Sequence, residues 1–142
     1  MKTIAVSGGF DPVHIGHLRM FQNARALGDK LVVILNNYNW LKTKKGYVFM
    51  PESERAEILR GFSCVDDVFI TNHEPNCSDM SVCSALRELR PDIFANGSDR
   101  KSDNVPEYSL CEELGIEMVF SVGGEKVQSS SEMVKQSKLN LH

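Results

Sequence analysis

The sequence predicts an α/β fold built on a single doubly wound parallel sheet of five strands, with helices on both faces. Short runs rich in β-branched and aromatic residues alternate with amphipathic helical patterns. Most of the strand-like runs lack strict polar alternation, as strands covered on both faces do. Strands joined through helices pair in parallel with right-handed crossovers. At 142 residues the chain has the size of one domain, so we expect residues 1–142 to form a single domain.

Five strands and five helices are expected in alternation. The strands are predicted at 2–7, 30–36, 66–71, 92–96 and 116–121, and the helices at 16–27, 51–62, 78–90, 105–114 and 129–136. Glycines follow the first and fourth helices at Gly28 and Gly115, where chains commonly leave a helix. Pro51 opens the second helix, and Pro91 follows the third. Ser129 and Glu132 form a possible capping box at the start of the last helix.

Composition excludes several classes of function. The formal net charge of −3 argues against a nucleic-acid partner, whose protein is usually strongly basic at its binding face. No apolar run approaches the length of about 20 residues that spans a bilayer, and the first residues lack a signal-peptide pattern, so we expect no membrane partner and a cytoplasmic protein. The four cysteines lack CxxC spacing, which predicts reduced thiols in or near the core.

Ligands of such a sheet bind outside the carboxyl ends of the strands, so the loops there are the candidate site. The loop after the first strand reads SGGFDPVHIGH and spans residues 7–17. Gly8 and Gly9 are expected to let the backbone turn tightly. Gly16 is expected to let an anion approach the start of the following helix, where free N–H groups favour negative charge.

A concentrated anion site is predicted from these loops. His14 and His17, three residues apart at a helix start, can point the same way and donate hydrogen bonds to phosphoryl oxygens. Residues 129–131 are serines that offer hydroxyls and N–H groups at a second helix start. The charge that a triphosphate demands comes from five basic side chains, Lys42, Lys44, Lys45, Arg55 and Arg100.

Each of these features also has a simpler interpretation. The histidine pair fits half of a zinc site, completed by His73 or a carboxylate, and it equally fits solvated residues at a helix start. The lysines of the second loop, residues 37–50, fit an exposed flexible loop, and the serines fit a plain helix cap. A dinucleotide site is disfavoured because no GxGxxG follows the first strand.

The loop SGGFDPVHIGH matches the (T/S)xGxFDxxHxGH signature of the HxGH nucleotidyltransferases, and the chain resembles this cytidylyltransferase-like family over nearly its whole length. The glycerol-3-phosphate cytidylyltransferase and heptose 1-phosphate adenylyltransferase types look closest. The resemblance implies a Rossmann-like nucleotidyltransferase fold. It departs from the cytidylyltransferases before the serines, where Gly124 and Glu125 replace an arginine and a threonine and Lys126 is the nearest remaining cation.

The resemblance implies roles for individual residues. Catalytic roles fall on His14, His17, Lys42, Lys44 and Arg55, and nucleotide-binding roles on Gly8, Gly9, Phe10, Asp11, Gly16, Asn96, Gly97, Asp99, Arg100, Ser129, Ser130 and Ser131. Asp11 is expected to order the loop by hydrogen bonds. The base is expected between residues 96–100 and the loop after the fifth strand. Mg²⁺ is expected to bridge the phosphates of the triphosphate, with few protein ligands or none.

The implied reaction moves a nucleoside monophosphate from a nucleoside triphosphate to a phosphorylated small molecule, with release of pyrophosphate. CTP and a polyol or sugar phosphate are favoured. The alternatives are ATP with a sugar phosphate or flavin mononucleotide, and a regulatory module that binds a nucleotide without turnover. A homodimer is expected because small family members commonly pair, and because Phe10, Trp40 and Phe49 are expected to be exposed on loops.

Overall fold

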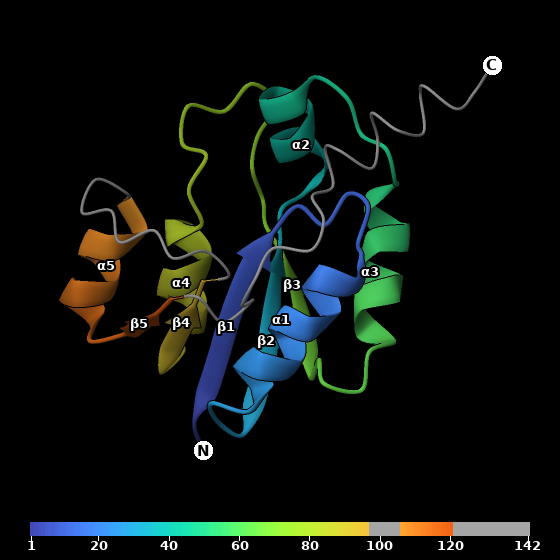
Figure 1. The fold of residues 1–142 in the computed structure, drawn as a ribbon. Coiled ribbons are helices and arrows are strands. Elements are labelled where there is room, and N and C mark those ends of the chain that lie inside the picture. Colours follow the sequence, from blue (N-terminus) through green and yellow to red (C-terminus); the bar gives the residue numbers. More distant parts are fainter. Residues whose placement is uncertain (97–105, 121–142) are drawn as a thin grey trace.

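The computed structural model describes residues 1–96 and 106–120 (Figure 1). Its strands and helices follow the predicted order, except that one additional helix follows the second strand. The helix predicted at 129–136 lies outside the described residues. In chain order they are β1 (Thr3–Gly8), α1 (Ile15–Arg25), β2 (Lys30–Leu35), α2 (Tyr38–Lys45), α3 (Glu52–Arg60), β3 (Asp67–Ile70), α4 (Cys83–Leu89), β4 (Ile93–Ala95), α5 (Pro106–Leu114) and β5 (Glu117–Val119). All strand pairs are parallel, in the order β3-β2-β1-β4-β5. The predicted fold class is confirmed.

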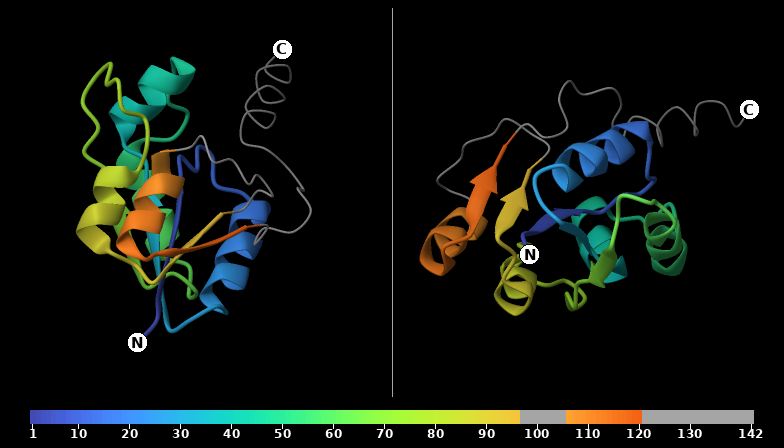
Figure 2. Two further views of the ribbon diagram at one scale, coloured as in Figure 1. Left: turned by 90° about the vertical axis from the view of Figure 1, so that its left-hand side faces the viewer. Right: turned by 90° about the horizontal axis from the view of Figure 1, so that it is seen from below.

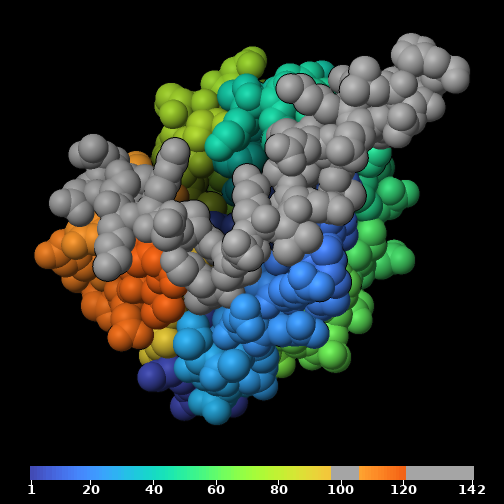
Figure 3. All heavy atoms as spheres, in the orientation of Figure 1, coloured from blue at the N-terminus to red at the C-terminus, as the bar shows by residue number. Residues whose placement is uncertain are grey.

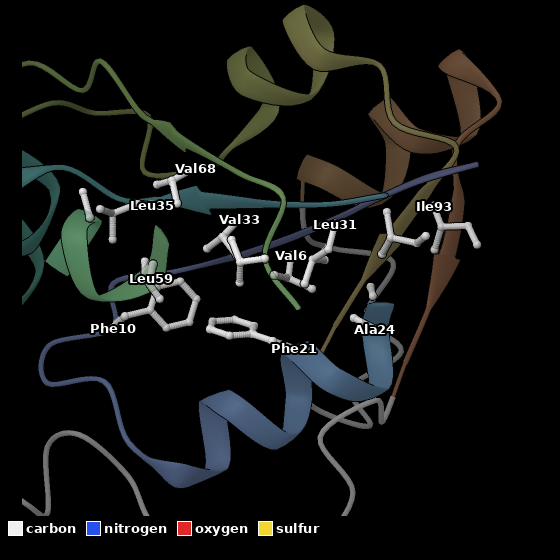
Figure 4. Packing of buried hydrophobic residues seen from close by; sticks show 14 residues of the cluster. Val6, Phe10, Phe21, Ala24, Leu31, Val33, Leu35, Leu59, Val68 and Ile93 are labelled. Carbon is white, nitrogen blue, oxygen red and sulfur yellow. The ribbon is translucent and has the colours of Figure 1, made fainter. Parts of the chain in front are cut away.

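Helices cover both faces of the sheet (Figure 2). On one face, α1 and α3 pack against a hydrophobic cluster that includes Val6, Phe21 and Leu59 (Figure 4). On the other face, α4 and α5 pack against a second cluster that includes Ala5 and Leu86. Alternate residues of β1 therefore enter opposite clusters, as the two-residue period of a strand requires.

Carboxylates fix the amino edge of the sheet. Asp29, Asp66 and Asp92 each accept a 2.8 Å hydrogen bond from a backbone N–H at or next to the start of β1 or β2. Asp29, Asp66 and Asp92 directly precede β2, β3 and β4 respectively. The register of the three central strands is thus held at this edge, which leaves the carboxyl edge to loops that carry function.

The segment 37–50 differs from the predicted loop, because α2 occupies its first half at the carboxyl edge of the sheet (Figure 1). The Asn37 side chain caps the helix by accepting from Trp40 N at 2.9 Å, and Gly46 ends it with φ of 79°. Only Leu41 of α2 is fully buried. So short an apolar stripe gives little helical periodicity in the sequence, which is why the loop prediction was wrong here.

The third predicted helix begins later than expected, since α4 starts at Cys83 and not at residue 78. Asp79 accepts hydrogen bonds from both the backbone N and the hydroxyl of Ser81. This local turn competes with helix formation, as Asp and Ser side chains commonly do.

The cysteines lie in or near the core as predicted, two buried and two partly buried, and all four are free thiols in the structure. Desolvation by burial raises the pKa of Cys111 to about 11 and also raises the pKa of Cys83, so both thiols stay protonated. None of the helices in the described ranges is long and apolar enough to cross a membrane.

Gly28 joins α1 to β2 where the chain passes close to the beginning of β1. A Cβ atom at this position would lie 2.8 Å from the carbonyl oxygen of Lys2 and would collide with the Ile4 side chain. We expect Gly28→Ala to lower the free energy of unfolding by about 1–3 kcal/mol, measured by urea denaturation.

Gly61 provides the matched control, because it is exposed after α3 at φ of −76° and its nearest prospective contact is 3.3 Å away. Gly61→Ala should change stability by no more than about 0.5 kcal/mol. Equal losses in the two variants would contradict the steric explanation.

Candidate functional site

The motif loop leaves β1 at the point where the strand order reverses, with β2 on one side of β1 and β4 on the other. Gly8 and Gly9 serve close packing here, and neither has the positive φ of a tight turn. A Cβ on Gly8 would lie 2.8 Å from the Phe10 ring, and one on Gly9 would lie 2.8 Å from Leu41 Cδ2. The expected role in a tight turn is therefore wrong, and the positive φ falls on Phe10.

Phe10 links the motif to the core. Its φ of 49° lies in the left-handed region, which a bulky side chain adopts only under tertiary constraint. The ring meets Phe21 edge-on at 5.3 Å, in the cluster of Figure 4, and meets the His17 ring at 4.9 Å and 89°. Phe10 is only 5% exposed, so the expectation that it lies exposed on a loop is wrong. Its ring instead packs edge-on against the His17 ring and supports it.

The two histidines of the motif form the start of α1. His14 is the N-cap, and its Nδ1 accepts from Gly16 N at 3.1 Å, while His14 N donates to His17 Nδ1 at 3.1 Å. Their rings stack with centroids 3.8 Å apart and planes 24° apart. Because both Nδ1 atoms accept, a neutral ring carries its proton on Nε2. The motif thus presents two Nε2–H donors side by side.

The environment of His17 keeps it neutral. Desolvation by burial, then the nearby His14 and Lys45, lower the pKa of His17 from 6.5 to about 3. A neutral imidazole donates one hydrogen bond through Nε2 and brings no charge of its own. His17 therefore adds no positive charge to the site at neutral pH.

Asp11 orders the loop, as expected. Its two carboxylate oxygens accept from the backbone N–H groups of Phe49, at 2.7 Å, and Met50. The motif loop is thereby tied to the chain that runs from α2 to α3. With both oxygens engaged, Asp11 is poorly placed to serve as a metal ligand.

Arg55 lies on α3 and is completely buried. Its side chain donates to three backbone carbonyls, Met50 O at 3.1 Å and Gly9 O and Asn36 O at 2.8 Å each. Burial lowers its pKa, with Asp11 and then Glu52 opposing the shift. Arg55 joins the ends of β1 and β2 and the start of α3, and its Nη2 atom is buried with no hydrogen-bond partner in the described residues.

The lysines of α2 differ in their surroundings. Lys42 donates to Gly46 O at 3.1 Å, and Lys44 lies over the Trp40 ring, 4.9 Å from its centroid. Both are exposed. Lys45 is half-buried and acts on the pKa of His17, so it is the α2 lysine that the structure couples to the histidine pair. The sequence reasoning left Lys45 outside the set of catalytic residues.

The chain after β3 holds α2 in place. His73 O accepts from the side chains of Asn37 and Asn39 at 3.0 and 2.8 Å, and Trp40 Nε1 donates to Met80 O at 2.8 Å. The position of the α2 lysines therefore depends on a segment that is remote in sequence.

The zinc interpretation of the histidine pair finds no support. The His73 ring bonds to Thr71 Oγ1 at 2.8 Å and to Ser81 O at 2.9 Å, so both of its nitrogens are engaged away from the motif. Within residues 1–96 and 106–120 no group of three or more His, Cys, Asp or Glu side chains could hold a metal.

Several predicted site residues lie outside the described residues, namely Gly97, Asp99, Arg100, Ser129, Ser130 and Ser131. Asn96 follows β4 at the carboxyl edge. The sequence reasoning missed Asn36, which follows β2 at the same edge and is 3% exposed, with Oδ1 buried and unpartnered in the part of the chain that the structure describes. Its only signal in the sequence is a polar residue that ends a run of buried apolar ones.

A doubly wound sheet with this histidine motif at the end of β1 defines a Rossmann-like α/β domain of the nucleotidyltransferase class. A family model described as cytidylyltransferase-like matches residues 5–136, and the chain belongs to this family. The predicted resemblance is confirmed.

Relatives of known name support the same class. The chain is 33% identical over 138 residues to the bifunctional protein HldE of Syntrophotalea carbinolica, which covers 94% of this chain and 27% of that protein. It is 38% identical over 104 residues to the FAD synthase of Thermococcus sibiricus, covering 72% and 67%. The chain thus spans about a quarter of the length of HldE and about two thirds of FAD synthase.

Among solved structures, the lipopolysaccharide core biosynthesis protein from Thermoplasma volcanium is similar with a TM-score of 0.66 and 28% identity, covering 84% of this chain and 93% of that one. A protein of unknown function from Archaeoglobus fulgidus shares the fold, with a TM-score of 0.59 and 18% identity, covering 91% and 95%. The matches identify a nucleotidyltransferase domain.

The low pKa of His17 gives a spectroscopic prediction. We expect the ¹⁵N shifts of its ring to report the neutral Nε2–H tautomer throughout pH 5–8, with protonation only near pH 3. Because the unfolded chain takes up this proton near pH 6.5, the contribution of His17 to stability is present above that pH and falls as the pH drops toward 3. A His17 titration midpoint near 6.5 in the folded protein would contradict this assignment.

Proposed function

We propose that the protein transfers a nucleoside monophosphate from a nucleoside triphosphate to a phosphorylated small molecule and releases pyrophosphate. The observation that carries this proposal is the pair of Nε2–H donors at the carboxyl edge of the sheet, created by the hydrogen bonds to both Nδ1 atoms. Two adjacent donors at a helix start suit phosphoryl oxygens.

The reaction needs positioning more than proton transfer. An oxygen of the acceptor phosphate attacks the α-phosphorus and forms a new P–O bond, while the bond from the α-phosphorus to the bridging oxygen breaks and pyrophosphate leaves. A phosphate monoester is already ionised at neutral pH, so no general base is required. His14 and His17 donate to the α and β phosphoryl oxygens, where charge shifts in the transition state.

Lysines of α2 supply the positive charge. Lys42 and Lys44 are exposed and would exchange their contacts with Gly46 O and the Trp40 ring for a triphosphate, and Lys45 already acts on His17. Arg55 contributes chiefly by holding the strand ends, because three carbonyls engage its guanidinium. Ser129, Ser130 and Ser131 are proposed to bind the β and γ phosphates, and Gly97, Asp99 and Arg100 the base side of the nucleotide.

Mg²⁺ is proposed to bind through the phosphates themselves. The Asp11 carboxylate already accepts two backbone hydrogen bonds, so the motif offers the ion no open protein ligand. A magnesium ion bound to the triphosphate supplies neutralisation of the charge on the leaving pyrophosphate.

ATP is the donor that we now place first, with CTP second. The sequence favours CTP through its resemblance to small cytidylyltransferases. The 38% identity to an FAD synthase, a protein named for making an adenine dinucleotide, favours ATP. The replacement of the family arginine by Gly124 favours it as well.

The regulatory alternative, the homodimer and the cytoplasmic location stay predictions. A regulatory module without turnover is disfavoured, because the stacked histidines place two hydrogen-bond donors side by side where a reacting phosphoryl group would lie. Of the three aromatic residues from which the homodimer was predicted, Phe49 is 48% exposed, Trp40 is half-buried and Phe10 is buried, and the homodimer stays a prediction. The cytoplasmic location rests on the sequence alone.

Substitution of His14 separates its two roles. Asparagine is a good N-cap and retains an acceptor for Gly16 N, but it lacks the Nε2–H donor. We expect His14→Asn to lower kcat about a hundredfold or more while the melting temperature stays within a few degrees of the wild type. Turnover near the wild-type value in a folded His14→Asn protein would remove His14 from the catalytic set.

Pyrophosphate release tests the reaction itself. The protein is mixed with each of the four nucleoside triphosphates and Mg²⁺, against glycerol 3-phosphate, a sugar 1-phosphate and flavin mononucleotide. We expect release only when donor and acceptor are both present, with ATP used at least tenfold more efficiently than GTP or UTP. Hydrolysis without an acceptor, or no release in any combination, would contradict the proposal.

A further inference from the structure

Trp40 joins three parts of the carboxyl edge of the sheet. Its Nε1 donates to Met80 O at 2.8 Å, in the chain between β3 and α4. Its six-membered ring lies against the motif loop, where a Cβ atom on Gly9 would come within 3.4 Å of Trp40 Cζ3. The Lys44 ammonium lies 4.9 Å from the centroid of the ring. One half-buried side chain thus contacts a segment remote in sequence, the motif loop and a cation of α2.

Packing in the hydrophobic core does not account for the position of Trp40. Neither of the two hydrophobic clusters includes Trp40 or the buried Leu41. Side chains of α2 instead donate hydrogen bonds to carbonyl groups of the chain after β3, from Asn37, Asn39 and Trp40. In Figure 3 the teal atoms of α2 lie beside the yellow-green atoms of that chain. A large aromatic side chain held outside the core and next to the motif is a candidate for a role in the site.

The hydrogen bond to Met80 O fixes how the indole lies. A tryptophan N–H only donates, and it usually finds a partner when the ring is buried. Nε1 and Cζ3 lie at opposite edges of the indole, so the bond to Met80 and the contact with Gly9 hold the ring at both ends. The ring therefore offers a face to Lys44, which follows Trp40 by four residues and lies on the same side of the helix.

The contact between Lys44 and the indole is weak enough to be exchanged. A cation over an exposed aromatic face shifts an equilibrium by only about two- to fivefold. Hydrogen bonds from an ammonium to ionised phosphoryl oxygens are charge-assisted and stronger, so a triphosphate would withdraw Lys44 from the ring. A lysine that is already held has lost part of its side-chain entropy, and binding a ligand then costs less. The ring thus prepares the cation for its ligand without competing strongly for it.

We propose that Trp40 is a positioning residue for the triphosphate, which holds the Lys44 ammonium beside the motif loop until the phosphates withdraw it. This inference rests on the proposed function. Trp40 acts on the phosphates only through Lys44, so it supports binding of the triphosphate in the ground state and in the transition state alike. Loss of such uniform binding raises KM and leaves kcat nearly unchanged. The indole face is uncovered in the same step.

Trp40 is the only tryptophan of the sequence, so its fluorescence reports this exchange directly. ATP, CTP or inorganic tripolyphosphate is added with Mg²⁺ and without an acceptor, and calorimetry measures binding in parallel. We expect a saturable change in Trp40 emission with at least one nucleotide, and the same change with tripolyphosphate, which has no base. Lys44→Met keeps a long side chain without the charge, so at saturation its emission should change by less than about a third as much. A change that only the nucleotides produce would show that the base meets the indole and would overturn the inference.

Kinetics distinguish this role from a structural one. We expect Trp40→Leu to raise KM for the nucleotide about fivefold, with kcat changed by less than about twofold. Trp40→Phe keeps a ring but lacks the N–H donor, and it should raise KM less. In a Lys44→Met background, Trp40→Leu should raise KM by less than about twofold, because its effect passes through Lys44. Tyr38 is the matched control, since it is an aromatic residue of α2 that is 50% exposed, and Tyr38→Leu should leave KM and Trp40 emission unchanged.

The outcomes separate this inference from the proposed function. Pyrophosphate release without a Lys44-dependent change in Trp40 emission would overturn the role of Trp40 alone, and so would equal effects of Trp40→Leu with and without the Lys44 charge. Nucleotide binding with the Lys44-dependent change, but without pyrophosphate release, would refute the transfer reaction and support the role of Trp40. If neither nucleotide binds, both fall. Because Lys44→Met alters an exposed side chain, the fluorescence comparison remains decisive even if Trp40→Leu fails to fold.

Discussion

Two hydrogen bonds at the start of α1, from backbone N–H groups to the Nδ1 atoms of two imidazole rings, determine most of what this site can do. His14 N and Gly16 N each end on an Nδ1 atom, so the same two bonds cap the helix and fix the tautomer of both rings. Burial also lowers the pKa of His17, so this ring is neutral and carries its proton on Nε2. His17 brings no charge of its own, so in the proposed function the positive charge that a triphosphate needs comes from the lysines of α2.

The arrangement of the cations follows from contacts between segments that are distant in sequence. Asn37, Asn39 and Trp40 attach α2 to the chain after β3, while Asp11 attaches the motif loop to the chain after α2. Arg55 then joins the ends of β1 and β2 through carbonyl groups. None of these contacts lies in a hydrophobic core. The carboxyl edge is therefore held by a polar network, and its fully buried members Asp11 and Arg55 would lose buried hydrogen bonds if its geometry changed.

The sequence was sufficient for the sheet, the order of its main elements and the histidine motif, because apolar periodicity and a specific signature both act locally. It was insufficient for α2, whose single buried side chain leaves no stripe, and for the start of α4, where a turn at Asp79 wins over helix propensity. Burial of Arg55 and Phe10 could not be read from the chain either. Both depend on which segments the fold brings over them, and a charged or loop aromatic residue is exposed by default. The unsatisfied amide of Asn36 is visible only when every neighbouring partner is known.

The left-handed backbone of Phe10 has a further consequence. One aromatic side chain belongs both to the apolar interior, through Phe21, and to the support of His17. The position of the His17 ring therefore depends on the packing of the hydrophobic core, because the same Phe10 ring contacts both. A substitution that changes the volume of the core at Phe10 would also shift the His17 ring. Tolerance to sequence change in the core near Phe10 is thus limited by the accuracy of the chemistry as well as by stability.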